Sequence, residues 1–199
     1  MMETTGCGTA IVTPFRADGT IDDVTPVYMG YSNPRDIVSI STGLGLFQRK
    51  LRLNVLVDYK GGFNLFNSTT QFYCQQTNFC YDVSIGPNSK MGPSATLYDQ
   101  ARNVAQRFVA GTKTQIGYLE SGQFWRFREL GVTAQLPNSF AQKLRSRDVG
   151  VTFAARNLHV WTQYKGIDPE SGYGNGDVQN DFSTTSPPTY FTFRLNLHY

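Results

Sequence analysis

The segment 190–199, YFTFRLNLHY, alternates apolar and polar residues without interruption. Side chains of a strand point to opposite faces with a period of two, so this segment has one apolar face and one polar face. The apolar face consists of Phe191, Phe193, Leu195, Leu197 and Tyr199. Its length matches that of a tilted strand that crosses a bilayer, about 9–11 residues. A soluble β-sandwich can end on such a strand too, so the rest of the chain has to decide.

The same alternation predicts four further strands. They cover residues 36–47, 51–60, 118–136 and 148–164. A short polar connection joins the first two, which favours an antiparallel hairpin. In the last two, the apolar residues change parity near Glu129 and near Asn157. An extra residue at each point, a β-bulge, would realign them, and the other interpretation is that each segment is two shorter strands.

Long and short connections alternate along the chain. We expect an all-β, antiparallel fold made of a loop, a hairpin, a long loop, a second hairpin, a loop and a terminal strand, over residues 1–35, 36–60, 61–117, 118–164, 165–189 and 190–199. The long loop also contains one short helical pattern, from Leu97 to Phe108 behind Ser94. Outer-membrane barrels show the same asymmetry, with short periplasmic turns and long extracellular loops.

Composition excludes several classes of protein. The mean hydropathy is −0.34, and no apolar run approaches the roughly 18 residues of a transmembrane helix. The net charge of +3 is spread along the chain, which argues against nucleic acid as a partner. The N-terminus, MMETT, carries no signal peptide. Since an outer-membrane protein needs one, we expect the chain to be a piece of a longer protein that carries it.

Aromatic residues gather at the predicted outer ends of the strands. Rings with one polar edge settle at membrane interfaces, where they form girdles in barrels. The residues that we expect at this interface are Tyr59, Trp125, Trp161, Tyr164 and Tyr190.

Several segments resemble one family. Residues 157–170, NLHVWTQYKGIDPE, are similar to a run near the end of SusC/RagA-type TonB-linked outer-membrane transporters. Residues 118–137, residues 58–67 and the Asp18–Asp22 run before Asn33-Pro34 resemble that family as well. The final residue departs from its commonest choice, Phe, but Tyr199 keeps the ring.

The resemblance implies that the chain is the C-terminal part, about five strands, of a transmembrane β-barrel in the bacterial outer membrane. Five strands cannot close, since the smallest membrane barrels need about eight. The implied function is TonB-dependent uptake of glycans or peptides without catalysis. The implied partners are the remainder of the barrel and its plug, which is absent here, the TonB complex acting through that plug, and a SusD-like surface lipoprotein. The barrel-assembly machinery would recognise the last strand.

Few residues indicate other chemistry. His159 and His198 lack a nucleophile constellation, so we predict no catalytic residue and no cofactor. Weak candidates for a Ca²⁺ site are Asp18, Asp22 and Asp23, which lack the alternating ligands and the terminal Glu of a calcium loop. A second acidic group comprises Asp168, Glu170, Asp177 and Asp181, for which solvated loop acidity is the simpler explanation. Cys74 and Cys80 could form a small loop disulfide in an oxidising compartment.

Two other functions stay open at this point. A secreted, soluble β-sandwich that binds carbohydrate would use the aromatic residues as stacking platforms and pack its apolar faces against a second sheet. A small self-contained barrel would need three more strands within 1–35 and 61–117, where sustained alternation is scarce.

Overall fold

The computed structural model describes residues 2–5, 9–12, 27–76, 79–80, 83–84, 96–98, 101, 116–172 and 179–199. These residues form two compact units. We call residues 36–60, 124–162 and 187–199 the sheet unit, and residues 1–35, 61–123 and 163–186 the loop unit. Each unit is described by itself.

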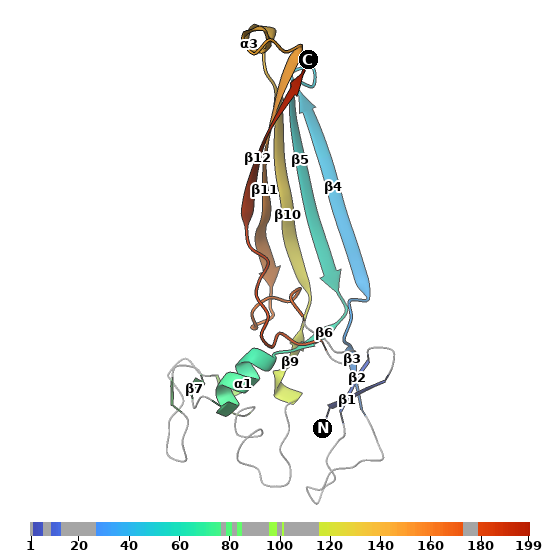
Figure 1. Cartoon of the computed structure of the whole chain (residues 1–199). Helices are drawn as coiled ribbons and strands as arrows, with labels where there is room; N and C mark the ends of the chain where they lie inside the picture. Colours follow the sequence, from blue (N-terminus) through green and yellow to red (C-terminus); the bar gives the residue numbers. More distant parts are fainter. Residues whose placement is uncertain are drawn as a thin grey trace, which may run out of the picture. The chain divides into compact units, whose positions relative to one another are not determined.

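The sheet unit contains five long strands, shown side by side in Figure 1. They are β4 (Asp36–Leu46), β5 (Leu51–Gly61), β10 (Phe124–Gln135), β11 (Asp148–Thr162) and β12 (Tyr190–His198). Their order in the sheet is β12-β11-β10-β5-β4, and β5, β10, β11 and β12 pair antiparallel. These are the five strands that the alternation predicts, and the all-β, antiparallel class is confirmed.

The third strand begins later than predicted. Ile116–Tyr118 forms a 3-10 turn (η1), and Leu119–Ser121 is a separate short strand, β9, that pairs with β6 (Asn64–Phe66). Gly122 follows it, and the Gly122 N–H donates to the Phe63 carbonyl at 3.0 Å. Within the predicted strand 118–136, residues 119–121 are a strand but a separate one, and residues 118, 122 and 123 are not in a strand.

The parity changes are β-bulges. In β10 the register shifts between Phe127 and Glu129, relative to both β5 and β11. Opposite this shift, β11 has two residues between Arg156 and His159, and Asn157 adopts a left-handed φ of 52°. The bulge interpretation is confirmed, because both strands continue through the shift in one sheet.

Two short connections lie at the end of the sheet that holds the C-terminus (Figure 1). The β4–β5 turn places Phe47, Gln48 and Arg49 at φ values of 51°, 58° and 67°. The β10–β11 connection contains α3 (Asn138–Lys143), with Pro137 at its N-cap. The Gln135 N–H donates to the Lys50 carbonyl, and the Arg147 N–H donates to that of His198. These bonds hold both connections and the C-terminus together.

The helix α3 ends in a Schellman motif. The Arg145 N–H donates to the Gln142 carbonyl and the Ser146 N–H to the Ala141 carbonyl. The left-handed residue of this motif is usually glycine, but here it is Arg145, with φ 53°. A left-handed conformation costs an ordinary residue about 1–2 kcal/mol. The chain thus carries arginines at two strained turn positions, Arg49 and Arg145.

The loop unit has more regular structure than predicted. Its first 35 residues contain a three-stranded sheet of β1 (Met2–Thr5), β2 (Thr9–Val12) and β3 (Val27–Tyr31). Residues 61–117 contain β6, α1 (Ser68–Gln76) and the pair β7 (Phe79–Cys80) and β8 (Val83–Ser84). Of the predicted helical pattern, residues 97, 98 and 101 are helical, and the remainder lies outside the described residues.

The core of the loop unit combines apolar and polar side chains. Phe63, Leu65 and Tyr118 are buried, as are Asn67 and Asp181. Asn67 caps α1, because its side-chain oxygen accepts the Thr70 N–H. Among the described residues, no helix is both long enough and apolar enough to cross a membrane.

Candidate functional surfaces of the sheet

One face of the sheet is apolar across all five strands, and we call it the apolar face. Residues paired across strands share a face, so the register assigns the β5, β10, β11 and β12 residues directly. One row, for example, runs Leu53, Val132, Phe153, Phe193. In β4, Ser39 and Gly43 lie against Asp58 and Asn54 on the opposite face, which leaves the even-numbered residues of β4 on the apolar face.

Many large apolar side chains on this face are exposed, although Val149 is buried. Their exposed fractions run from 37% for Leu130 to 70% for Phe193. The exposed set includes Val38, Ile40, Leu44, Leu46, Trp125, Leu130, Phe153, Trp161, Phe191, Phe193 and Leu195. An exposed apolar surface of this extent marks a site that another apolar medium or partner covers.

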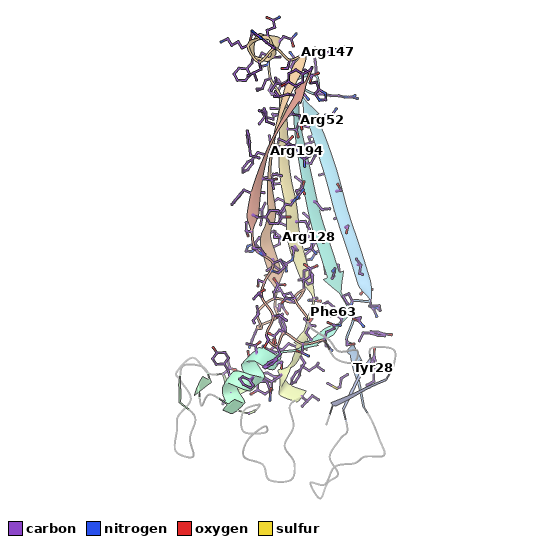
Figure 2. The ribbon with its side chains drawn as sticks, viewed as in Figure 1. Tyr28, Arg52, Phe63, Arg128, Arg147 and Arg194 are labelled. Atoms are coloured by element: carbon purple, nitrogen blue, oxygen red, sulfur yellow. The ribbon has the colours of Figure 1, made fainter. Side chains whose placement is uncertain are left out.

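The opposite face, which we call the polar face, carries paired charges. Arg128, the bulged residue of β10, donates from Nε to Asp58 Oδ2 at 2.6 Å, and Ser39 Oγ donates to Asp58 Oδ1 at 2.8 Å. Arg156 donates from Nε to Glu129 Oε2 at 2.7 Å. Figure 2 shows Arg128, Arg52 and Arg194 along the strands.

Sequence reasoning found only part of this face. In 51–60 and 190–199, the residues that alternate with the apolar ones include Arg52, Asp58, Lys60, Arg194, Asn196 and His198, and the register places all six on the polar face. Sequence reasoning missed Arg128, Glu129 and Arg156, although the parity change at Glu129 was the available signal. The bulge turns two consecutive residues, Arg128 and Glu129, towards the same face, where each meets an opposite charge.

The structure brings three of the predicted interface aromatics together. Tyr59, Trp125 and Trp161 are direct cross-strand neighbours, and the rings of Tyr59 and Trp125 are 4.8 Å apart. Tyr190 starts β12 opposite Arg156, which precedes Trp161 by five residues along β11, and it shares the polar face with Arg156. Tyr164 lies in the loop unit, where its side chain is buried. This burial differs from the exposed interfacial position that the sequence predicts for Tyr164.

The terminal strand forms one edge of the sheet. Among the described strands, β12 pairs only with β11, and β4 forms the other edge with β5 as its neighbour. Phe191, Phe193 and Leu195 project from β12 on the apolar face, as the alternation predicts, and Tyr199 follows the strand with 86% exposure. A sheet with two open edges presents unpaired backbone groups on both sides, so it is a template for further strands.

A hollow of about 290 Å³ lies beside the small residues of β4. It is lined by Gly43, Leu44, Gly45, Arg49, Arg52 and Asn54. The glycines leave room on the polar face, and the two arginines give this room a positive charge. The hollow can therefore accept a polar or acidic segment lying against the sheet.

In the loop unit, Asp181 joins segments that are distant in sequence. Its Oδ1 accepts the Thr69 N–H at 2.9 Å and its Oδ2 accepts the Ile167 N–H at 3.1 Å. Burial, followed by the neighbouring carboxylates of Asp181 and Glu120, raises the pKa of Tyr164 well above its ordinary value. Asp181 thus acts as a structural connector between α1 and the segment after β11.

The candidate metal residues do not assemble into a described site. Asp18, Asp22, Asp23 and Asp177 lie outside the described residues. Asp168 accepts the Glu170 N–H at 2.8 Å, which closes a local turn. Within the described part of the chain, no three side chains of His, Cys, Asp or Glu are grouped so that they could hold a metal ion.

The remaining candidates are two cysteines and two histidines. Cys74 is buried and disulfide-bonded, while the side chain of Cys80 lies outside the described ones, so the pairing of these two stays a prediction. His159 lies on the apolar face and packs edge-to-face on Trp161 at 4.6 Å. His198 lies 3.9 Å from Asp148 at the end of the sheet.

Comparisons with known proteins agree with this geometry. No family model matches the chain. It is 29% identical over 89 residues to TonB-dependent receptor P3 of Formosa agariphila, which covers 41% of this chain and 9% of that receptor. The solved structure of the RagAB peptide transporter superposes with a TM-score of 0.57 at 20% identity, over 96% of this chain and 23% of the transporter chain. The RagAB peptide importer in the open-open state gives a TM-score of 0.55 at 22% identity, over 100% and 22%.

The sheet has the fold of a segment of these transporters. The resemblance to SusC/RagA-type TonB-linked transporters is therefore confirmed in sequence by the receptor and in fold by the RagAB structures. The chain spans less than a quarter of the length of each of these proteins.

Proposed function

We propose that this chain forms part of the wall of a TonB-dependent outer-membrane transporter that takes up glycans or peptides. The observation that carries the proposal is the apolar face, exposed over five adjacent strands of 9–15 residues. A tilted strand needs about 9–11 residues to cross a bilayer. In this role the apolar face contacts lipid, and the polar face lines the water-filled interior.

The open edges support the fragment part of the proposal. A membrane barrel has no edge, because unpaired backbone groups are too costly in hydrocarbon. β4 and β12 therefore need partner strands, and the remainder of the same barrel supplies them in this proposal. The hollow beside Gly43 and Gly45 then faces the interior, where a plug connected to the TonB complex can lie against it.

The lengths of the connections indicate which end of the sheet faces the periplasm in this proposal. The short connections, 47–50 and 136–147, lie at the same end of the sheet as the C-terminus. Barrels place short turns in the periplasm and long loops outside. In this orientation the loop unit is extracellular, where a SusD-like lipoprotein is the expected partner, and its disulfide at Cys74 suits an oxidising compartment.

The carbohydrate-binding sandwich is not favoured. It requires the apolar strand faces to pack against a second sheet, and these side chains are exposed instead. The small self-contained barrel needs further long strands, whereas the described strands outside the sheet unit are no longer than five residues.

The function can be tested by probing the two faces of β12 separately. Single cysteines at Phe193 and at Arg194, labelled with a fluorophore in isolated outer membranes, should differ in their access to a quencher attached to lipid tails. The label at 193 should be strongly quenched and the label at 194 weakly. Equal quenching at both sites, or recovery of the protein in the water-soluble fraction, would contradict the lipid-facing assignment.

The terminal strand offers a second test. We propose that its apolar row and the final ring are the signal read by the barrel-assembly machinery. Deleting Tyr199 from the complete transporter should lower its amount in the outer membrane, while replacing Tyr199 by Phe should not. Unchanged assembly after the deletion would remove this part of the proposal.

A further inference from the structure

The short-connection end of the sheet unit is strongly basic. Residues 47–50 and 136–147 hold five of the chain's 18 Lys and Arg, and they contain no Asp or Glu. The five are Arg49, Lys50, Lys143, Arg145 and Arg147. We call these two connections the basic end. Figure 2 shows Arg147 there, beside α3.

These cations point to solvent rather than to acidic partners. All five side chains are exposed, and none makes an ion pair with any residue that the structure describes. The nearest acid in sequence, Asp148, faces His198 at 3.9 Å. Arg128 and Arg156 of the strands differ from these five, because each is paired with a carboxylate.

Exposed apolar side chains lie among the cations. Phe47, Phe140 and Leu144 have exposed fractions of 75%, 48% and 41%. They occupy the same two connections as the five cations, at the end of a sheet whose apolar face is exposed. A ligand that suits this surface carries a negative charge next to hydrocarbon.

Two of the five cations, Arg49 and Arg145, adopt a backbone conformation that is unfavourable for arginine. Arg49 and Arg145 have φ values of 67° and 53°, in the left-handed region that favours glycine or asparagine. Arg145 also fills the usual glycine position of the Schellman motif. Local strain of this kind is found where a side chain has a function. Neither side chain has a described partner within the chain that would account for it.

We propose that the basic end is a binding site for anionic phospholipid headgroups. The phosphodiester and glycerol of a lipid such as phosphatidylglycerol meet the cations, and its acyl chains meet Phe47, Phe140 and Leu144. The inference rests on the proposed function, because short periplasmic turns lie at the phospholipid leaflet. The site anchors this end of the sheet at the membrane surface and fixes its depth.

The test uses the protein in detergent, purified together with the rest of its barrel. Equal amounts of phosphatidylglycerol and phosphatidylcholine are added, and retained lipids are counted by native mass spectrometry. Each Lys or Arg near a charged surface contributes a factor of about five in affinity. The wild type should retain phosphatidylglycerol preferentially. The variant with all five cations replaced by Gln should lose this preference by at least about tenfold.

Arg145→Gly separates the lipid site from a structural role. Glycine relieves the left-handed strain, so the thermal stability should stay equal or rise, while phosphatidylglycerol retention should fall about fivefold. Arg145→Lys should restore retention. The matched control is Arg194→Gln, which removes one exposed cation from the polar face and should leave retention unchanged.

The outcomes distinguish the two proposals. A protein that stays soluble without detergent would contradict the proposed function itself. A protein that needs detergent but retains both lipids equally, or loses phosphatidylglycerol as strongly in the control, would overturn the lipid site alone. Displacement by equimolar inorganic phosphate would overturn it too, since it would assign the cations to free anions.

Discussion

The interior of the loop unit and the apolar face of the sheet unit differ in how far their large apolar side chains are exposed. In the loop unit Phe63, Leu65 and Tyr118 are buried, with exposed fractions of 6%, 2% and 0%. In the sheet unit Phe191 and Phe193 are exposed at 64% and 70%. The loop unit follows the rule for proteins in water, where apolar surface is removed from the solvent. The apolar face of the sheet unit reverses it, which supports the proposal that this face meets lipid while the loop unit meets water.

The polar groups differ in the same way. Asp181, 1% exposed, accepts backbone N–H groups within the loop unit. Asp58 and Glu129 stand on an open face of the sheet, where each pairs with an arginine. A buried carboxylate stabilises an interior, whereas paired charges on an open face suit a wet lumen.

Reversing the polarity of the apolar face should have the largest effect. Phe193→Arg places a charge near the middle of β12, where an arginine facing the bilayer midplane costs about 2–4 kcal/mol. We expect a large loss of folded protein from the outer membrane, measured as the fraction that keeps its heat-modifiable mobility on gels.

The matched control for this variant is Thr192→Arg, one residue away on the polar face. It should assemble almost normally. Equal losses in both variants would mean that the two faces of β12 meet the same solvent, and the contrast between the units would then have to be abandoned.

Removing the Asp181 carboxylate should affect the loop unit alone. Asp181→Ala leaves the part-buried N–H groups of Thr69 and Ile167 without their acceptor, which together costs about 2 kcal/mol. Hydrogen exchange should accelerate in α1 and around Ile167, while the amides of β10 and β11 keep their protection. Faster exchange throughout the sheet would show that the units do not fold independently.

A pair of glycines compares the packing of the two units. A Cβ at Gly122 would lie 2.5 Å from a ring carbon of Phe63, whereas one at Gly131 would meet its nearest atom at 3.6 Å. Gly122→Ala should therefore destabilise the loop unit by about 1.5 kcal/mol, as overpacking does. Gly131→Ala in β10 should be tolerated. Thermal melts in detergent measure both, and similar melting temperatures would contradict the difference in packing.

Local periodicity predicted the sheet but could not predict the loop unit. The period-two pattern located all five long strands, and the parity change at Glu129 located the bulge, because both signals depend only on residues that are close in sequence. The bond from Thr69 to Asp181 joins positions 112 residues apart, and no local pattern records it. α1 was missed because its sequence, STTQFYCQQ, has little apolar periodicity. Asn67 as its N-cap was the one available signal.

Surfaces were predicted less well than strands. The alternation extended the fourth strand to residue 164 and so grouped Tyr164 with Trp161 at its outer end. The chain instead leaves β11 at Thr162, and Tyr164 is buried in the loop unit. The sequence also did not predict the positive φ values of Arg49 and Arg145. A turn sequence does not show which residue takes a positive φ unless that residue is glycine or asparagine.

The smallest expected effect concerns the Asp58–Arg128 pair on the polar face. Both side chains are about one-fifth exposed, so water screens the pair only partly. A double-mutant cycle of Asp58→Asn and Arg128→Gln should give a coupling energy of about 0.5–1 kcal/mol, measured by urea unfolding in lipid vesicles. Raising the salt concentration should reduce it, because a lumen is open to ions. A coupling energy of several kcal/mol that ignores salt would mean that this face is dry, which would place the sheet in the same class of environment as the buried core around Asp181.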